Sequence, residues 1–126
     1  MLQMLKRGRR LLLLDDDTAM QKLMGTLLRR NGYRVDVVSS GKQAIEKLGT
    51  NEYDALLLDL MTPTEGGLTV IRHLQENEPE VLKRVILVTA SPDSVLKNVS
   101  GSVAAVVRKP FAPDELTETV ARIAKQ

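Results

Sequence analysis

Several short apolar runs of this 126-residue chain end in polar side chains whose types suit one kind of chemistry. Leu11–Leu14 leads into three aspartates, and Ala55–Leu58 leads into a fourth. Two later runs end near a threonine and a lysine, so the set comprises Asp15, Asp16, Asp17, Asp59, Thr89 and Lys109. Converging carboxylates repel one another unless a cation lies between them, and oxygen ligands without sulfur or histidine suit Mg²⁺. Together with an ammonium and a hydroxyl, they predict phosphoryl transfer to an aspartate that acts as the nucleophile.

Each of these residues also has an ordinary structural interpretation. Asp17 is expected to cap a helix, and an aspartate such as Asp59, which precedes a loop rich in proline and glycine, is typical of a turn. The Thr89 hydroxyl can bond to backbone, and a lone lysine such as Lys109 is usually a solvated surface charge. Taken together, these structural interpretations are less favoured than each is alone, because four separate strand ends would have to carry such side chains by accident.

The spacing of the apolar residues predicts a chain that alternates between strands and helices. Short continuous apolar runs are typical of strands buried on both faces, and the segments between them repeat with a helical period. The predicted strands cover residues 11–14, 33–38, 55–58, 85–88 and 103–107. A helix follows each strand, which predicts an α/β fold: a doubly wound (βα)5 three-layer sandwich with a five-stranded parallel sheet. Ligand sites of such sheets lie at the carboxyl ends of the strands, where the polar residues fall.

Length and composition exclude several classes of protein. A chain of this length suits one domain, and the hydrophobic fraction of 43% excludes wholesale disorder. Without cysteine, and with His73 as the single histidine, the chain lacks the residues for a disulfide framework, a thiolate metal site or a multi-histidine zinc site. Apolar runs are too short for a membrane span, and we therefore expect a cytoplasmic protein.

Charge is distributed unevenly along the chain. The formal net charge is +2, but the first ten residues hold four basic and no acidic side chains, so the rest of the chain is slightly acidic. We expect residues 1–9 to form a basic, flexible leader and residues 10–126 to form the folded domain. A basic leader can contact nucleic acid or acidic lipid, but a solvated chain end is the favoured interpretation. We expect no direct nucleic-acid binding by the domain itself.

Four sequence motifs together resemble the receiver domain of two-component response regulators, in the superfamily of the chemotaxis regulators. The motifs read LLLLDDD from Leu11, ALLLDLMTP from Ala55, ILVTA from Ile86 and VVRKPF from Val106. They occur in the order and spacing of that family, and the resemblance covers roughly residues 10–125. It implies the flavodoxin-like form of the doubly wound fold, with strand order 2-1-3-4-5.

The resemblance also implies a role for each residue of the site. Asp59 resembles the phospho-accepting aspartate, and Thr89 resembles the switch hydroxyl that moves onto the phosphoryl group. Lys109 resembles the lysine of the site, which family members usually join to the following proline through a cis peptide bond.

The metal ligands follow from the same resemblance. Asp15 and Asp16 resemble the acidic pair that holds Mg²⁺ beside Asp59, with Asp16 as the more direct ligand and Asp15 acting largely through water. Met61 would offer its backbone carbonyl to the metal, so the identity of its side chain matters little there. The implied cofactor is therefore Mg²⁺.

Partners and activity are implied in the same way. A histidine kinase or a histidine phosphotransfer protein would donate the phosphoryl group, and a downstream effector or output domain would respond to the change. The implied function is a phosphorelay signalling switch that catalyses only its own phosphorylation and dephosphorylation. Such a protein is not a turnover enzyme.

Three departures from the family pattern leave an alternative open. Val106 stands where the family typically has tyrosine or phenylalanine, the fourth helix is shortened, and residues 61–67 lack the usual Asp-Gly ending. The first two favour a phosphorylation-independent, receiver-like protein-interaction module with an altered output face. A nucleotide- or flavin-binding domain of the same topology is disfavoured, because aspartates occupy the place of a glycine-rich phosphate loop after the first strand.

Overall fold

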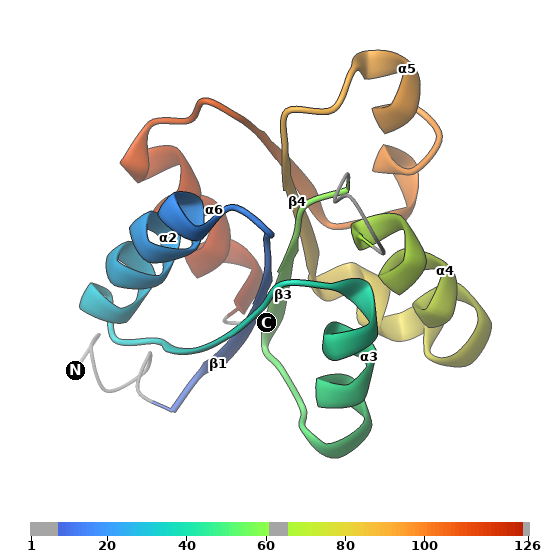
Figure 1. Ribbon diagram of the computed structural model, residues 1–126, viewed down its shortest axis with the longest axis horizontal. Helices are drawn as coiled ribbons and strands as arrows, with labels where there is room; N and C mark the ends of the chain where they lie inside the picture. The colour runs from blue at the N-terminus through green and yellow to red at the C-terminus, as the bar shows by residue number, and fades with distance from the viewer. Residues whose placement is uncertain (1–7, 61–65, 125–126) are drawn as a thin grey trace.

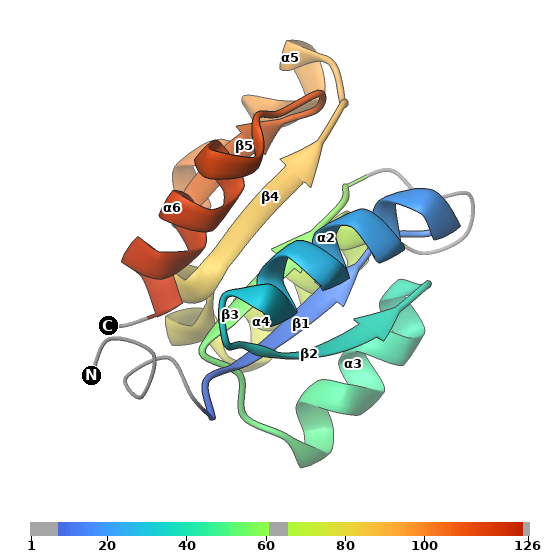
Figure 2. The ribbon, with the colours of Figure 1, turned by 90° about the vertical axis from the view of Figure 1, so that its left-hand side faces the viewer.

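The computed structural model describes residues 8–60 and 66–124, and it confirms the predicted fold class. Within these residues, five parallel strands form one sheet in the order β2-β1-β3-β4-β5 (Figure 1, with all five strands labelled in Figure 2). The strands are β1 (Arg10–Leu14), β2 (Arg34–Val38), β3 (Ala55–Leu58), β4 (Val85–Thr89) and β5 (Ala105–Arg108). This is the flavodoxin-like order that the family resemblance implied.

Helices connect and cover these strands on both faces of the sheet. They are α2 (Thr18–Arg30), α3 (Gly41–Thr50), α4 (Gly67–Asn77), α5 (Asp93–Leu96) and α6 (Pro113–Ala124), with 3-10 turns at Pro79–Arg84 and Ser100–Ser102. One layer contains α2 and α6, and the opposite layer contains α3 and α4 (Figure 2). None of the helices in the described residues is both long enough and apolar enough to cross a membrane.

Alternate residues of the central strands enter two separate hydrophobic clusters. In β1, Leu12 and Leu14 pack in the cluster beneath α3 and α4, whereas Leu11 and Leu13 pack in the cluster beneath α2 and α6. All four side chains are almost completely buried. A strand covered on both faces needs an apolar residue at every position, which explains the continuous apolar runs in the sequence.

Short polar side chains cap two of the helices, and the cap at Asp17 is the one predicted above. The Asp17 carboxylate accepts a hydrogen bond from the Met20 amide at 3.1 Å, at the start of α2. At the start of α3, the Ser40 hydroxyl accepts one from the Gln43 amide at 3.2 Å. These bonds satisfy amide groups that the first helical turn leaves unpaired. They fix the direction in which the chain leaves the polar edge of the sheet.

The segment around α5 differs from the prediction. The sequence predicts a helix that begins at Pro92 behind a serine cap, but α5 begins at Asp93 and Pro92 is itself the cap residue. The Ser91 hydroxyl bonds instead to the hydroxyl of Thr89, the last residue of β4. The helix then ends at Leu96, ahead of Ser100-Gly101, where the sequence predicts the helix to break. α5 is therefore even shorter than the sequence indicates.

A polar network ties β1, β2 and β3 together at the amino ends of the strands. The Tyr53 hydroxyl donates a hydrogen bond to the Asp36 carboxylate at 2.7 Å, and the Arg10 guanidinium donates to the same oxygen at 3.0 Å. The Arg10 amide also donates to the Asp54 carboxylate at 2.7 Å. These bonds hold β1, β2 and β3 together at the edge of the sheet opposite to the one where the aspartates of the predicted site lie.

Candidate functional site

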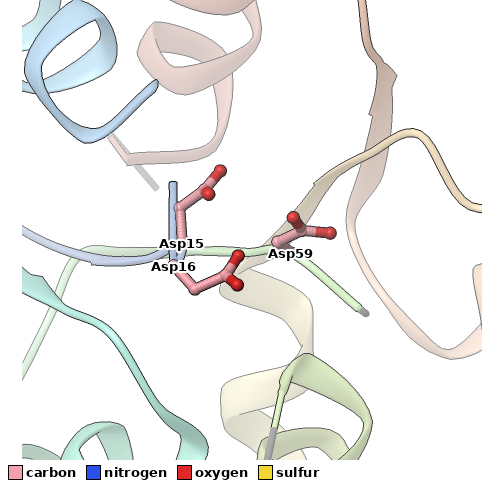
Figure 3. A group of neighbouring side chains, drawn as sticks. All are labelled: Asp15, Asp16 and Asp59. Atoms are coloured by element: carbon pink, nitrogen blue, oxygen red, sulfur yellow. The ribbon is translucent and has the colours of Figure 1, made fainter. Parts of the chain in front are cut away.

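Strand register brings the aspartates of β1 and β3 to the same edge of the sheet. Leu14 pairs with Leu58, and the Asp59 amide donates a hydrogen bond to the Leu14 carbonyl at 3.0 Å. Asp15 and Asp59 therefore follow neighbouring strands at the same level. Figure 3 shows their carboxylates beside that of Asp16.

The Asp59 carboxylate lies at the centre of the site. Its Oδ1 atom accepts a hydrogen bond from the Thr89 hydroxyl at 2.8 Å, and its Oδ2 atom accepts one from the Lys109 ammonium at 3.2 Å. Thr89 is the last residue of β4, and Lys109 directly follows β5. Asp59 is 9% exposed and lines an open cleft of about 270 Å³. The carboxylate is thus held at both oxygens and still faces solvent.

Lys109 also contacts the second carboxylate of the site. Its ammonium donates a hydrogen bond to Asp15 Oδ2 at 2.6 Å, and Asp15 is only 1% exposed. Burial lowers the pKa of Lys109, but the hydrogen bonds and charges of Asp15 and Asp59 outweigh this effect, so the net pKa lies above its usual value. Lys109 is therefore a fixed cation between two carboxylates at neutral pH. Its peptide bond to Pro110 is cis, as the family resemblance implied.

The three aspartates have the arrangement that a hard divalent cation requires. Asp15, Asp16 and Asp59 each offer a carboxylate oxygen, and the three oxygens lie within 4.8 Å of one another. Asp16 is exposed, so its carboxylate can reach a hydrated ion from the solvent side. A set made only of carboxylate oxygens suits Mg²⁺. Met61, whose backbone carbonyl was expected to complete the set, lies outside the described residues.

Two residues join the site that sequence reasoning did not assign to it. Ser91, expected only to cap a helix, is buried with its hydroxyl 2.9 Å from that of Thr89. Gly67, expected only in a loop, begins α4 and donates its amide to the Asp59 carbonyl at 2.7 Å. The Gly66-Gly67 pair was the sequence signal for such a close backbone approach.

Replacement of Lys109 by methionine should destabilise the fold in a pH-dependent way. The Lys109→Met variant keeps the apolar stem but leaves the buried Asp15 and Asp59 carboxylates without their shared cation, so we expect a loss of roughly 2 kcal/mol at pH 7. Because folding raises the pKa of Lys109, its contribution is complete below the unfolded pKa and disappears as pH rises through the folded pKa. Urea unfolding of both proteins between pH 7 and pH 11 measures the difference. The loss of unfolding free energy in Lys109→Met should shrink above pH 10. A loss that grows there, or one no larger than that of the exposed Lys97→Met control, would contradict the role of Lys109 as the shared cation.

An alanine at position 67 should distort the acceptor aspartate. A Cβ atom built on Gly67 would lie 2.6 Å from the Asp59 carbonyl oxygen, so the backbone of one residue must move. We expect Gly67→Ala to cost about 1–3 kcal/mol of stability and to weaken magnesium binding at the site. Gly49→Ala is the matched control: its Cβ meets nothing within 4 Å among the described residues, so this variant should gain up to about 1 kcal/mol. Thermal unfolding and magnesium titration test both variants, and equal behaviour of the two would refute the close approach.

Comparison with known proteins agrees with this geometry. The family model of the response regulator receiver domain matches residues 11–121. Response regulator MprA of Mycobacterium ulcerans is 37% identical over 110 residues, which are 85% of this chain and 46% of that protein. The chain thus spans about half the length of the curated relatives it matches.

Solved structures with the same fold include two that hold magnesium. The receiver domain of a sensor histidine kinase from Pseudomonas aeruginosa PAO1, with a magnesium ion coordinated in its active site cleft, has a TM-score of 0.84 at 27% identity, over 94% of this chain and 99% of that one. The response regulator TrrA of Thermotoga maritima, in complex with Mg²⁺–BeF, has a TM-score of 0.81 at 30% identity, over 91% of this chain and 98% of that one. The family match, the strand order and the arrangement of the polar strand ends agree, and the chain belongs to the response regulator receiver domain family.

Proposed function

We propose that the chain is a phosphoacceptor switch of a two-component system, with Asp59 as the residue that carries the phosphoryl group. The observation that supports this best is the environment of the Asp59 carboxylate. It faces an open cleft, and it contacts the Thr89 hydroxyl through one oxygen and the Lys109 ammonium through the other. A nucleophilic carboxylate held by a cation and a hydroxyl is equipped to accept an anionic group and to respond to it.

The proposed reaction forms one bond and breaks another. A carboxylate oxygen of Asp59 attacks the phosphorus atom of a phosphohistidine, and the new O–P bond forms as the P–N bond breaks. The imidazole leaves with the electron pair of that bond and takes up a proton. Lys109 offsets negative charge that develops on the phosphoryl oxygens, and the Thr89 proton provides a hydrogen bond to one of them. This chain catalyses its own modification, and it is not a turnover enzyme.

Magnesium is the cofactor that the carboxylates of the site would hold. Asp15, Asp16 and Asp59 supply a set of oxygens that fits a hard cation. When bound, Mg²⁺ supplies positive charge that offsets the charge of the carboxylates and of the incoming phosphoryl group. The magnesium found in the related receiver domain from Pseudomonas aeruginosa supports this proposal.

The proposed partners follow from membership in the receiver family. A histidine kinase or a histidine phosphotransfer protein would donate the phosphoryl group, and an effector or output domain would read the modified state. We place this exchange in the cytoplasm, without direct nucleic-acid binding by the domain itself. Incubation with acetyl phosphate and Mg²⁺, followed by intact mass measurement, tests the proposed function. A gain of one phosphoryl group that hydroxylamine removes is expected, and an unchanged mass would favour the alternative function below.

The alternative is an interaction module that works without phosphorylation, and the region around β5 favours it. Val106 is half-buried and packs with Val95, Val99 and Val103 against the cluster beneath α3 and α4. α5 beside it has only four residues. A small β-branched side chain cannot exchange a large apolar area between buried and exposed states. This face is therefore poorly suited to report a change at Asp59.

Phosphorylation should produce a small response on this face. We expect amide hydrogen exchange across residues 91–108 to change little when beryllofluoride, a phosphoryl mimic, is added with Mg²⁺, because a modification shifts an equilibrium only by its differential interaction with two states. The Val106→Tyr variant restores a large side chain and should enlarge the response in the same residues. Changes in the unmodified chain that match those beside Asp59 would show that Val106 does not limit the switch.

A further inference from the structure

Ser91 is a buried hydroxyl whose hydrogen bonds lead directly to the acceptor aspartate. The residue is only 4% exposed and lines the same cleft as Asp59. Its hydroxyl lies 2.9 Å from the Thr89 hydroxyl, and its amide donates to the same Thr89 oxygen at 3.2 Å. Thr89 in turn contacts Asp59 at 2.8 Å. Ser91, Thr89 and Asp59 therefore form a continuous chain of hydrogen bonds.

Counting protons assigns a direction to this chain. An ionised carboxylate only accepts hydrogen bonds, so the single proton of the Thr89 hydroxyl points to Asp59. The Ser91 hydroxyl must then be the donor in its contact with Thr89. The Thr89 oxygen thus accepts two hydrogen bonds, one from the hydroxyl and one from the amide of the same serine. The proton and both lone pairs of the Thr89 hydroxyl then all take part in hydrogen bonds, and these bonds hold the hydroxyl in this orientation.

Neighbouring residues keep Ser91 in place. Pro92 follows it directly, and a residue before proline is restricted to extended conformations. β4 ends at Thr89 and α5 begins at Asp93, so a short segment anchored at both ends carries Ser91. The two Ser91 donors therefore have little freedom to follow the Thr89 oxygen when it moves.

We propose that Ser91 is a positioning residue that holds the Thr89 hydroxyl on Asp59 in the resting state. This inference rests on the proposed phosphoacceptor function, because only a group bound at Asp59 requires the Thr89 proton to turn away from the carboxylate. Turning that proton also rotates the two lone pairs of the Thr89 oxygen that accept the Ser91 hydrogen bonds, so the movement disturbs those bonds. The Ser91 hydroxyl consequently opposes the transition, and its removal favours the state in which Thr89 contacts a phosphoryl group.

Beryllofluoride titration of the magnesium-loaded chain measures this effect. Loss of one hydrogen bond that exists only in the resting state should make Ser91→Ala bind beryllofluoride about two- to tenfold more tightly than the unmodified chain. Ser91→Thr keeps the hydroxyl and should stay within about twofold of the unmodified chain, which separates the hydroxyl from the effect of altered packing. Ser94→Ala removes an exposed hydroxyl from α5 and should leave the affinity unchanged. Equal or weaker binding by Ser91→Ala would overturn the inference.

A second titration distinguishes action through Thr89 from a direct or purely structural role. In a Thr89→Ala background the hydroxyl that Ser91 positions is absent, so adding Ser91→Ala should not change the affinity for beryllofluoride further. An equal gain in both backgrounds would mean that Ser91 does not act through Thr89, and it would overturn the inference. If the unmodified chain does not bind beryllofluoride at all, the result contradicts the proposed function, and the inference about Ser91, which rests on that function, is contradicted as well. If the unmodified chain binds and Ser91→Ala matches it, the inference alone falls.

Discussion

Asp59→Asn is expected to abolish the gain of a phosphoryl group from acetyl phosphate. The asparagine side chain has nearly the same shape and can still accept a hydrogen bond from Thr89 or Lys109, but its neutral amide is not a nucleophile toward phosphorus. Replacement also removes one of three neighbouring carboxylates, so stability should be retained or should increase. Intact mass measurement after incubation with acetyl phosphate and Mg²⁺ tests the loss of modification, and thermal unfolding tests the stability.

A matched control separates the loss of a nucleophile from the loss of a charge. Asp93→Asn removes a carboxylate from the first residue of α5, where Asp93 is exposed and pairs with Arg108. This variant should gain the phosphoryl group as the unmodified chain does. If Asp59→Asn gains the same mass as the control, another residue carries the modification, and the assignment of Asp59 is wrong.

Asp16→Asn is expected to reduce magnesium affinity at least about tenfold, since loss of an outer-shell partner alone costs about 10- to 100-fold. The Asp16 carboxylate lies in the same group as those of Asp15 and Asp59, and it is the exposed member of the three. Asp15 already binds Lys109 and the Asp17 amide, so it has less freedom to compensate for the loss. Calorimetric titration with Mg²⁺ measures the affinity, and the unmodified chain should show a single site.

Asp17→Asn provides the comparison for this titration. It removes the same charge one position further along the chain, and asparagine can still cap α2 through the Met20 amide. Asp17 is not part of the carboxylate group that could hold a metal ion. We therefore expect its magnesium affinity to stay within about threefold of that of the unmodified chain, because only the general electrostatic attraction changes. Equal losses in the two variants would indicate a diffuse charge effect instead of a coordinated ion.

The strands and the polar residues at their ends could be predicted because local sequence determines them. Leu11–Leu14 and Ala55–Leu58 are apolar at every position, as required of strands covered on both faces. In a parallel sheet all strands point the same way, so the residues after these runs must meet at one edge. The approach of Asp15 to Asp59 therefore follows from the strand order and register. These properties leave few alternatives for the position of the site.

Contacts made where the chain passes between a strand and a helix could not be predicted in the same way. The pattern Ser91-Pro92-Asp93 favours a helix cap locally, but Thr89 at the end of β4 binds the serine hydroxyl instead. The contact between Gly67 and the Asp59 carbonyl depends on the path of the chain into α4. Neither apolar periodicity nor capping preference contains information about these distances. Both missed residues accordingly lie where two elements meet at the site.

Borohydride trapping tests the central claim most directly, because it identifies the modified residue itself. Borohydride reduces an aspartyl phosphate to homoserine, so the position of the phosphoryl group is preserved as a stable change in the peptide. After incubation with acetyl phosphate and Mg²⁺, reduction and peptide mass mapping, we expect homoserine at position 59 and unmodified aspartate at positions 15 and 16. Homoserine at another aspartate, or a phosphoryl group retained on serine, threonine or His73, would contradict the account of Asp59 as the phosphoacceptor.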